Sequence, residues 1–133
     1  MKKMLLLTGL LYTANTLLAS NVLCREPEKY IFKDNTQKST YENCKRNGMT
    51  WWYKDDGSIK SEVNFIDDKE NGLYTSYHTN SKKKIVVNYV NAQKDGIQKI
   101  YYDNGQLGSQ VNYKMGRREG VMTDWDIEGY KSA

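Results

Sequence analysis

Acidic side chains are the first candidates for chemistry in this sequence. Asp55 stands beside Asp56, and Asp67 stands beside Asp68, as in a general acid-base pair or an oxygen-ligand metal site. Asp is also favoured in turns, because its carboxylate accepts hydrogen bonds from nearby backbone amides. Both pairs lie among residues of turn composition, and we therefore predict a structural role for them.

The residues around His78 argue against a calcium loop and against a hydrolytic site. The stretch from Asp67 to Gly72 resembles the opening of a calcium loop, but Lys69 occupies a ligand position and His78 stands where the bidentate Glu should be. The sequence has no second histidine, no Cys/His cluster and no Gly-x-Ser-x-Gly elbow. We expect no catalytic residue, no metal site and no cofactor, and we predict that the chain is not an enzyme.

Two basic clusters lie among the tyrosines, namely Lys82, Lys83 and Lys84, and Arg117 with Arg118. Such a mixture can bind single-stranded nucleic acid or anionic lipid head groups. Both clusters fall in or beside expected turns, where charged residues keep sheet edges soluble, and this interpretation is favoured. The net charge of +4 is small and its positive and negative residues are well mixed, so nucleic-acid binding is not expected.

The N-terminus has the three parts of a secretory signal peptide, which we place at residues 1–20. Lys2 and Lys3 precede an apolar stretch over residues 4–18, and the small residues Ala19 and Ser20 follow. The stretch is interrupted by polar residues and is shorter than the roughly 20 apolar residues of a spanning helix. We expect export to the periplasm, the outer surface or the medium, without a transmembrane span in the mature chain.

The two cysteines, Cys24 and Cys44, allow two interpretations. In an oxidising compartment they could pair and close a loop of about 20 residues, which would stabilise the fold by roughly 3 kcal/mol. Alternatively, Cys24 could carry a lipid, although Leu23 before it is bulkier than a lipidation site prefers.

The elements that must position these residues follow a period of 24 residues. Recurrence on this scale indicates stacked supersecondary units. Three full copies and a partial fourth occupy residues 48–133, and residues 21–47 are expected to cap the first copy. The recurring columns are Gly48, Gly72, Gly96 and Gly120; Tyr53, Tyr77, Tyr101 and Trp125; and Val63, Val87 and Val111.

Each copy has the pattern of a β-hairpin. Two runs rich in β-branched and aromatic residues are separated by turn residues, and the chain contains only one Pro. A three-residue turn with a left-handed third residue fits Asp55, Asp56 and Gly57. We predict an all-β protein, an elongated and twisted single antiparallel sheet of tandem β-hairpins. One face is expected to carry the tyrosine and valine columns together with Met49, Leu73, Ile97 and Val121.

The repeated unit, roughly G-x-x-x-x-Y-Y-x-[DN]-G-x-[IL]-x-x-x-V-N-[YF], resembles the short bacterial variant of the MORN repeat. Bacterial proteins built from this unit are commonly identified as YwqK-type toxin-antitoxin system antitoxins. The resemblance covers Gly48 to Ala133. It implies elongated sheets of β-hairpins that are used for interaction, with no shared catalytic residues.

Several large apolar side chains stand outside these columns. Trp52 and Tyr74 alternate away from the expected valine face, and exposed aromatic side chains often anchor a partner. They could instead pack against the N-terminal segment. The candidate interaction surface is Trp51, Trp52, Tyr74, Ile100 and Met122.

Together these patterns predict an exported, non-enzymatic repeat protein that binds another protein through an aromatic β-sheet surface. An antitoxin-like protein that neutralises its partner is one form of this function. Binding of a glycan, an envelope polymer or anionic lipid head groups through the tyrosines is the alternative.

Overall fold

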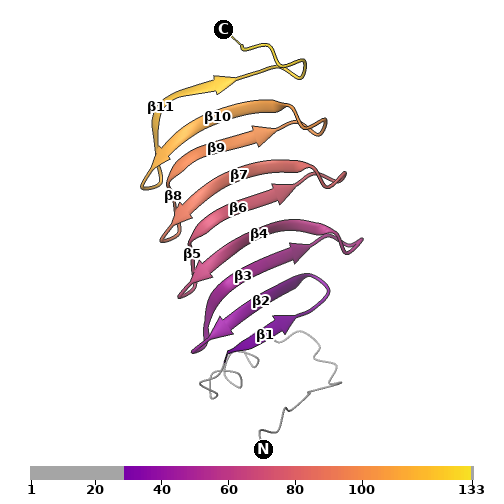
Figure 1. The fold of residues 1–133 in the computed structure, drawn as a ribbon, viewed down its shortest axis with the longest axis vertical. Coiled ribbons are helices and arrows are strands. Elements are labelled where there is room, and N and C mark those ends of the chain that lie inside the picture. Colours follow the sequence, from indigo (N-terminus) through magenta and orange to yellow (C-terminus); the bar gives the residue numbers. More distant parts are fainter. Residues whose placement is uncertain (1–28, 133) are drawn as a thin grey trace, which may run out of the picture.

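The structure, a computed structural model, describes residues 29–132. The described residues contain strands and no helix. The eleven strands form one antiparallel sheet, as predicted. They stack along the long axis of the molecule (Figure 1). The predicted signal peptide and Cys24 lie outside the described residues. The strands are β1 (Tyr30–Lys33), β2 (Gln37–Glu42), β3 (Lys45–Tyr53), β4 (Ile59–Ile66), β5 (Lys69–Glu70), β6 (Gly72–Tyr77), β7 (Lys83–Val90), β8 (Gln93–Lys94), β9 (Gly96–Tyr101), β10 (Leu107–Lys114) and β11 (Arg117–Asp124).

Residues 29–47, the described part of the expected cap, continue the same sheet. β1 pairs with β2, and β2 pairs with β3. Tyr41 lies opposite Arg46 as Phe65 lies opposite Glu70, so this part of β2 keeps the register of the full repeats. The N-terminal hairpin therefore adds one more pair of strands at the end of the sheet.

The three-residue turns predicted at the hairpin ends are confirmed. Gly57 N donates a hydrogen bond to Lys54 O at 2.9 Å, and Lys54 N donates to Ser58 O at 2.8 Å. Gly57 has a φ of 80°, the left-handed conformation that this turn requires in its third residue. The equivalent residues Ser81 and Gly105 have φ values of 63° and 95°.

A β-bulge follows each of these turns and exchanges the two faces of the hairpin. Tyr53 lies opposite Ile59, whereas Trp52 lies opposite Ser61, so Lys60 is an extra residue on β4. A slip of one residue moves every following side chain to the other face relative to its partner strand. The same shift occurs between β6 and β7 and between β9 and β10.

The bulge makes the predicted assignment of faces wrong. Val63 lies opposite Thr50, and Val87 lies opposite Tyr74. The aliphatic residues that were expected beside the valines are on the other face of the sheet. Met49, Leu73 and Ile97 lie opposite Asn64, Asn88 and Asn112.

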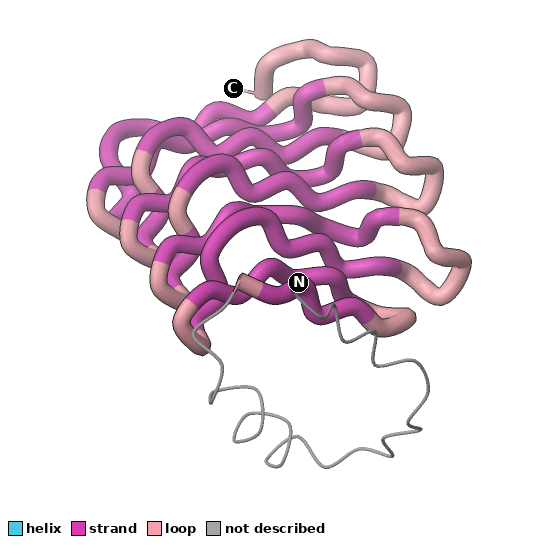
Figure 2. The backbone as a smooth tube through the Cα atoms, turned by 60° about the horizontal axis from the view of Figure 1, so that its bottom comes forward, coloured by secondary structure: helices cyan, strands magenta, loops and turns pink. Residues whose placement is uncertain are grey.

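The buried apolar side chains lie on the face that carries the valines, which we name the inner face. Val63 and Val87 are each 1% exposed, Phe65 is 2% exposed and Val111 is 4% exposed. A single sheet has no second layer, so it can bury these side chains only where it curls over them. Figure 2 shows the strands curving around one side of the molecule. The tyrosine column is only half-buried and does not belong to this set.

A second bulge and a polar turn join one repeat to the next. Gly72 and Gly96 have φ values of 118° and 104°, which explains why glycine recurs at this position. The polar turns are also linked to one another, because Ala92 N donates to Glu70 O at 2.9 Å and Gly116 N donates to Lys94 O at 2.8 Å. Each repeat is thus held to its neighbour at this edge as well as along the strands.

Candidate functional site

An exposed column of aliphatic side chains crosses the outer face, the face opposite the valines. Leu73 is 54% exposed, Ile97 is 52% exposed and Val121 is 89% exposed. The sequence analysis placed these residues on the valine face, and the pairing of Leu73 and Ile97 with Asn88 and Asn112 shows that this was wrong. Single exposed aliphatic residues are ordinary, but these three occupy one position of successive repeats and therefore line up across the strands.

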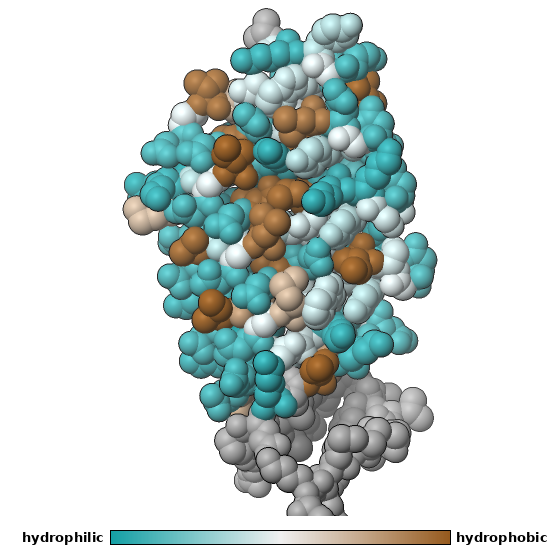
Figure 3. Space-filling view, in the orientation of Figure 1, coloured by the Kyte–Doolittle hydropathy of each residue, from teal (hydrophilic) through white to brown (hydrophobic). Residues whose placement is uncertain are grey.

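A second exposed column runs beside the first. Ile66 is 49% exposed and Val90 is 43% exposed. Each stands two residues beyond an asparagine of the outer face, on β4 and β7, and so shares that face. We name the two columns together the outer stripe: Ile66, Leu73, Val90, Ile97 and Val121. Figure 3 shows apolar side chains scattered between polar ones along one face of the molecule.

The asparagine column beside the outer stripe has a structural role. Asn64 Nδ2 donates to Asn71 O at 3.0 Å, and Asn112 Nδ2 donates to Glu119 Oε2 at 2.8 Å. These bonds tie β4 and β10 to the polar segment that follows each of them. The stripe is therefore flanked by side chains whose hydrogen bonds are already made within the fold.

The acidic pair Asp67 and Asp68 is part of a polar turn, as predicted. Both residues have positive φ, at 48° and 65°. Asp68 Oδ1 accepts a hydrogen bond from Arg46 N at 2.8 Å, and Asp67 Oδ1 accepts one from Asn47 Nδ2 at 3.3 Å. Within residues 29–132, no group of three acidic, His or Cys side chains is placed to hold a metal ion.

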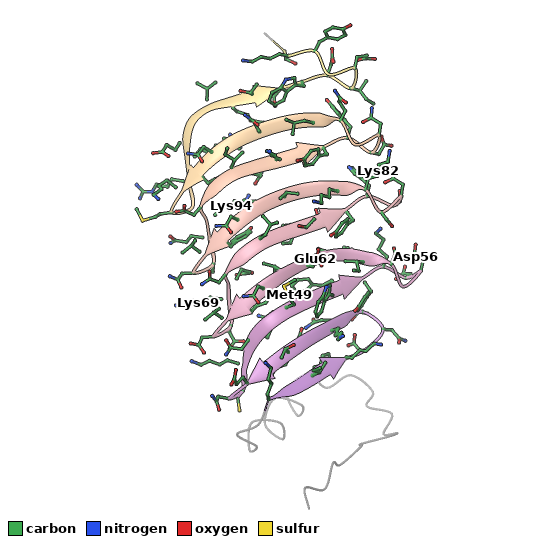
Figure 4. The ribbon with its side chains drawn as sticks, viewed as in Figure 1. Met49, Asp56, Glu62, Lys69, Lys82 and Lys94 are labelled. Carbon is green, nitrogen blue, oxygen red and sulfur yellow. The ribbon has the colours of Figure 1, made fainter. Side chains whose placement is uncertain are left out.

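Uncompensated positive charge lies in the polar turns, at the edge next to the outer stripe. Lys69 and Arg117 are exposed, and neither makes an ion pair within the described part of the chain. Figure 4 labels Lys69 at this edge. Three other basic residues at this edge are paired with acidic ones: Lys45 with Asp67 at 3.9 Å, Arg46 with Asp68 at 3.5 Å and Lys114 with Asp95 at 3.6 Å.

His78 belongs to a ladder of contacts at the opposite, hairpin edge. Lys54 Nζ donates to His78 O at 2.6 Å, and His78 Nε2 lies 2.8 Å from Tyr101 O, a hydrogen bond that requires the proton on Nε2. The hydroxyl of Tyr102 donates to Trp125 O at 3.0 Å. His78 is half-buried and connects two repeats.

The predicted aromatic surface is divided between the two faces. Trp51 is on the outer face, where Lys38 Nζ lies 5.1 Å from the centre of its ring. Trp52, Tyr74 and Ile100 share the inner face with the valines, so the expectation that Trp52 and Tyr74 point away from that face was wrong. Met122 lies on the edge strand β11 and is 41% exposed.

Sequence reasoning missed the outer stripe because it assumed strict alternation through each hairpin. Lys60, Lys84 and Gly108, the three bulge residues, interrupt that alternation. A charged residue or a glycine three positions after the last residue of the expected turn was the available signal. The possible disulfide between Cys24 and Cys44 stays a prediction, because Cys24 lies outside the described residues. Cys44 is half-buried and lies in the turn between β2 and β3.

Two segments one period apart match a known repeat family. Residues 70–91 and 94–115 match the family model described as MORN repeat variant. These two segments are similar to the MORN repeat variant. The match supports a MORN-repeat protein, without selecting the narrower YwqK-type family. The two matched segments are built as β-hairpins of a single sheet, in agreement with the resemblance.

Similarity to solved structures is weak. A mutant of S. aureus TarM in complex with Fondaparinux, alpha-GlcNAc-glycerol and UDP aligns with 14% identity and a TM-score of 0.39, over 80% of this chain and 24% of that one. Another crystal structure of TarM aligns with 15% identity and a TM-score of 0.37, over 76% of this chain and 22% of that one. The chain thus spans less than a quarter of these proteins.

No curated protein matches the chain. The described residues contain no helix long and apolar enough to cross a membrane.

Proposed function

We propose that this chain is an exported, non-enzymatic binding protein whose outer stripe docks onto another protein. The observation that carries the proposal is the alignment of Leu73, Ile97 and Val121, each at least half exposed, at one position of successive repeats. Their exposure means that they add little to the stability of the sheet. Large aliphatic side chains aligned on a surface are typical of an interface.

The spacing of the stripe fits a helical segment of the partner. Each repeat contributes two strands, and neighbouring strands lie about 4.8 Å apart, so successive stripe residues are about 9.6 Å apart. Seven residues of an α-helix rise about 10.5 Å. A helix with an apolar residue at every seventh position would therefore meet Leu73, Ile97 and Val121 in turn. Helices of this amphipathic kind commonly dock into apolar surfaces.

The charge beside the stripe favours an acidic partner segment. Lys69 and Arg117 are exposed at the neighbouring edge without ion pairs in the described structure. Acidic side chains flanking the apolar positions of the helix would face them and would speed association. An antitoxin-like role is the case in which this segment belongs to an exported toxin.

Export rests on the N-terminal pattern of Lys2, Lys3 and the apolar stretch that follows. The partner is accordingly expected in the periplasm, on the outer surface or in the medium. Absence of enzymatic activity rests on the sequence, which lacks a recognisable catalytic constellation. His78 and the Asp67 and Asp68 pair are engaged in contacts within the fold.

A capture experiment tests the proposal. The native chain and the double variant Leu73→Lys, Ile97→Lys are used to capture proteins from the exported fraction of the source cells. The control is Thr79→Lys, Asp103→Lys, which places the same charges in the same two repeats but at the hairpin edge. Loss of two apolar contacts should reduce capture of one protein by more than about tenfold, while the control retains it. Equal capture by both double variants would refute the outer stripe as the docking site.

A further inference from the structure

A hollow at the hairpin edge gathers aromatic and charged side chains that the outer stripe does not use. Its volume is about 520 Å³, and its lining includes Trp52, Tyr53, Tyr74, Asp55 and Lys60. This volume lies in the usual range for small-molecule sites, which hold a few polar groups among apolar and aromatic walls. The hollow opens beside the turn between β3 and β4.

A second hollow of about 490 Å³ adjoins the first. The two share Tyr53 and Asp55, and the second extends to Asp34 and Asn35 in the turn between β1 and β2. We name these two adjoining hollows the groove; they lie beside the β1–β2 and β3–β4 turns. A ligand with at least two linked units would be needed to occupy it.

The aromatic walls of the groove are held in place by other rings. Trp52 packs edge-on against Phe65, with ring centres 6.2 Å apart and planes at 62°. Tyr74 packs in the same way against Tyr89, at 6.2 Å and 74°. Phe65 is 2% exposed, so the ring that orients Trp52 is itself fixed in the core. The walls therefore need little reorganisation to receive a ligand.

Two charged groups of the first hollow, Asp55 and Lys60, are available to a ligand, whereas Asp34 in the second hollow already accepts hydrogen bonds from Thr36 and Gln37. Asp56 in the adjacent turn accepts hydrogen bonds from Ser58 N at 2.8 Å and from Ser58 Oγ at 2.6 Å. Within residues 29–132, the side chains of Asp55 and Lys60 have no such bond and no ion pair. The groove thus offers one free acceptor group and one free donor group beside two aromatic walls.

Comparison of equivalent positions in the repeats shows which side chains of the groove the hairpin fold does not need. A residue that the hairpin itself needs should recur every 24 residues, as the glycine column does. The equivalent hollow in the third repeat, of about 400 Å³, has Ile100 in place of Trp52 and Gly108 in place of Lys60. The fold therefore tolerates the loss of both side chains; Lys recurs at position 84, but Trp52 stands in the first full repeat alone and calls for another explanation.

We infer that this groove binds a pyranose oligosaccharide. A pyranose ring has an apolar C–H face that packs on an aromatic ring, and hydroxyl groups at its rim that both donate and accept hydrogen bonds. Trp52 and Tyr74 supply the aromatic walls, Asp55 accepts from rim hydroxyls and Lys60 donates to them. The adjoining hollow at Asp34 and Asn35 receives the next sugar unit.

Titration with defined sugars tests this inference. Cellotriose, maltotriose and chitotriose are each titrated into the full chain while heat and tryptophan fluorescence are recorded. Binding of at least one is expected, with a fluorescence change that Trp52→Ile abolishes. The substitutions Asp55→Asn and Lys60→Gly should each weaken binding by about fivefold or more. Their matched controls, Asp103→Asn and Lys84→Gly, alter the same positions of other repeats and should leave binding unchanged.

The inference is overturned if none of the three sugars gives heat or a fluorescence change up to about 10 mM, or if the controls weaken binding as much as the groove variants do. It is also overturned if a captured protein, rather than sugar, is lost on Asp55→Asn. The double variant Leu73→Lys, Ile97→Lys should bind sugar as the native chain does. The sugar titration therefore tests the groove, and the capture experiment tests the outer stripe, independently of each other.

Discussion

Tyr77 and Glu62 form a contact on the outer face whose strength depends on pH. The hydroxyl of Tyr77 donates to Glu62 Oε1 at 2.6 Å. Partial burial, this hydrogen bond and the nearby carboxylate raise the pKa of Tyr77 to about 12. Because the folded protein holds this proton more tightly than the unfolded chain, the stabilisation is complete below about pH 10 and is lost between about pH 10 and 12.

Replacing Tyr77 by Phe should therefore change the response to alkali. Thermal unfolding of the native chain is expected to lose more stability between about pH 10 and 12 than unfolding of Tyr77→Phe. Tyr130→Phe is the control, since that residue is 73% exposed. If the thermal stability of the native chain and of Tyr77→Phe fell in parallel as the pH rises, the hydrogen bond to Glu62 would not be what stabilises the protonated form of Tyr77.

Asn80 connects two hairpin turns through its amide group. Its Nδ2 donates to Asp103 O at 2.6 Å, and its Oδ1 accepts from Lys82 N at 3.1 Å. Asn80→Asp keeps the acceptor but loses the donor and places a carboxylate against a carbonyl oxygen. Equilibrium unfolding should show a loss of about 1 kcal/mol, whereas Asn91→Asp in an exposed polar turn should show little change. An equal effect of both changes would argue against the ladder at this edge.

At the residue scale, the sequence predicted the turns well. Asp55, Asp56 and Gly57 form the expected three-residue turn, because local turn chemistry depends on neighbouring residues alone. Contacts between turns were not predicted. The bonds made by Asn80 and His78 reach carbonyl groups one repeat away, and their formation depends on how closely successive repeats stack.

The strand is the scale at which the sequence analysis went wrong. Counting residues through the turn placed Leu73 and Ile97 beside the valines, and the single extra residue of each bulge reverses that result. A bulge is a small change in local backbone conformation, and residues as different as Lys60 and Gly108 occupy it. The pattern of apolar residues therefore does not reveal it.

Unfolding measurements can test the corrected faces of the strands. Val87 is 1% exposed, so Val87→Ala should cost about 2 kcal/mol through lost burial. Leu73 is 54% exposed, so Leu73→Ala should cost less than about 0.5 kcal/mol even though it removes more atoms. A larger loss of unfolding free energy for Leu73→Ala than for Val87→Ala would support the assignment of faces made from the sequence.

The glycine that opens each repeat is required by its backbone conformation. Gly96 has a φ of 104°, and an added Cβ would meet no atom within 4 Å. Gly96→Val should therefore destabilise the fold by about 1–3 kcal/mol through backbone strain alone. An unfolding midpoint equal to that of an exposed control, Gln93→Ala, would show that no strain is present.

At the scale of the whole molecule, the apolar core and the proposed protein-docking stripe lie on opposite faces of one sheet. The inner face buries Val63, Phe65, Val87 and Val111 under the curl of the strands. The sequence predicted the single sheet, because the period and the hairpin pattern repeat along the chain. It could not predict the curl, which decides that the apolar core lies on one face only.

The most direct test of the outer stripe as the docking site is site-specific photocrosslinking to the partner protein. Benzoylphenylalanine is placed at position 73 or 97 on the outer stripe, and at position 56 or 104 at the hairpin edge as controls. The outer positions should each crosslink to the same protein, at two sites about seven residues apart in one helical segment, and the controls should not. Crosslinks from positions 56 and 104 without crosslinks from 73 and 97 would contradict the outer stripe as the docking site.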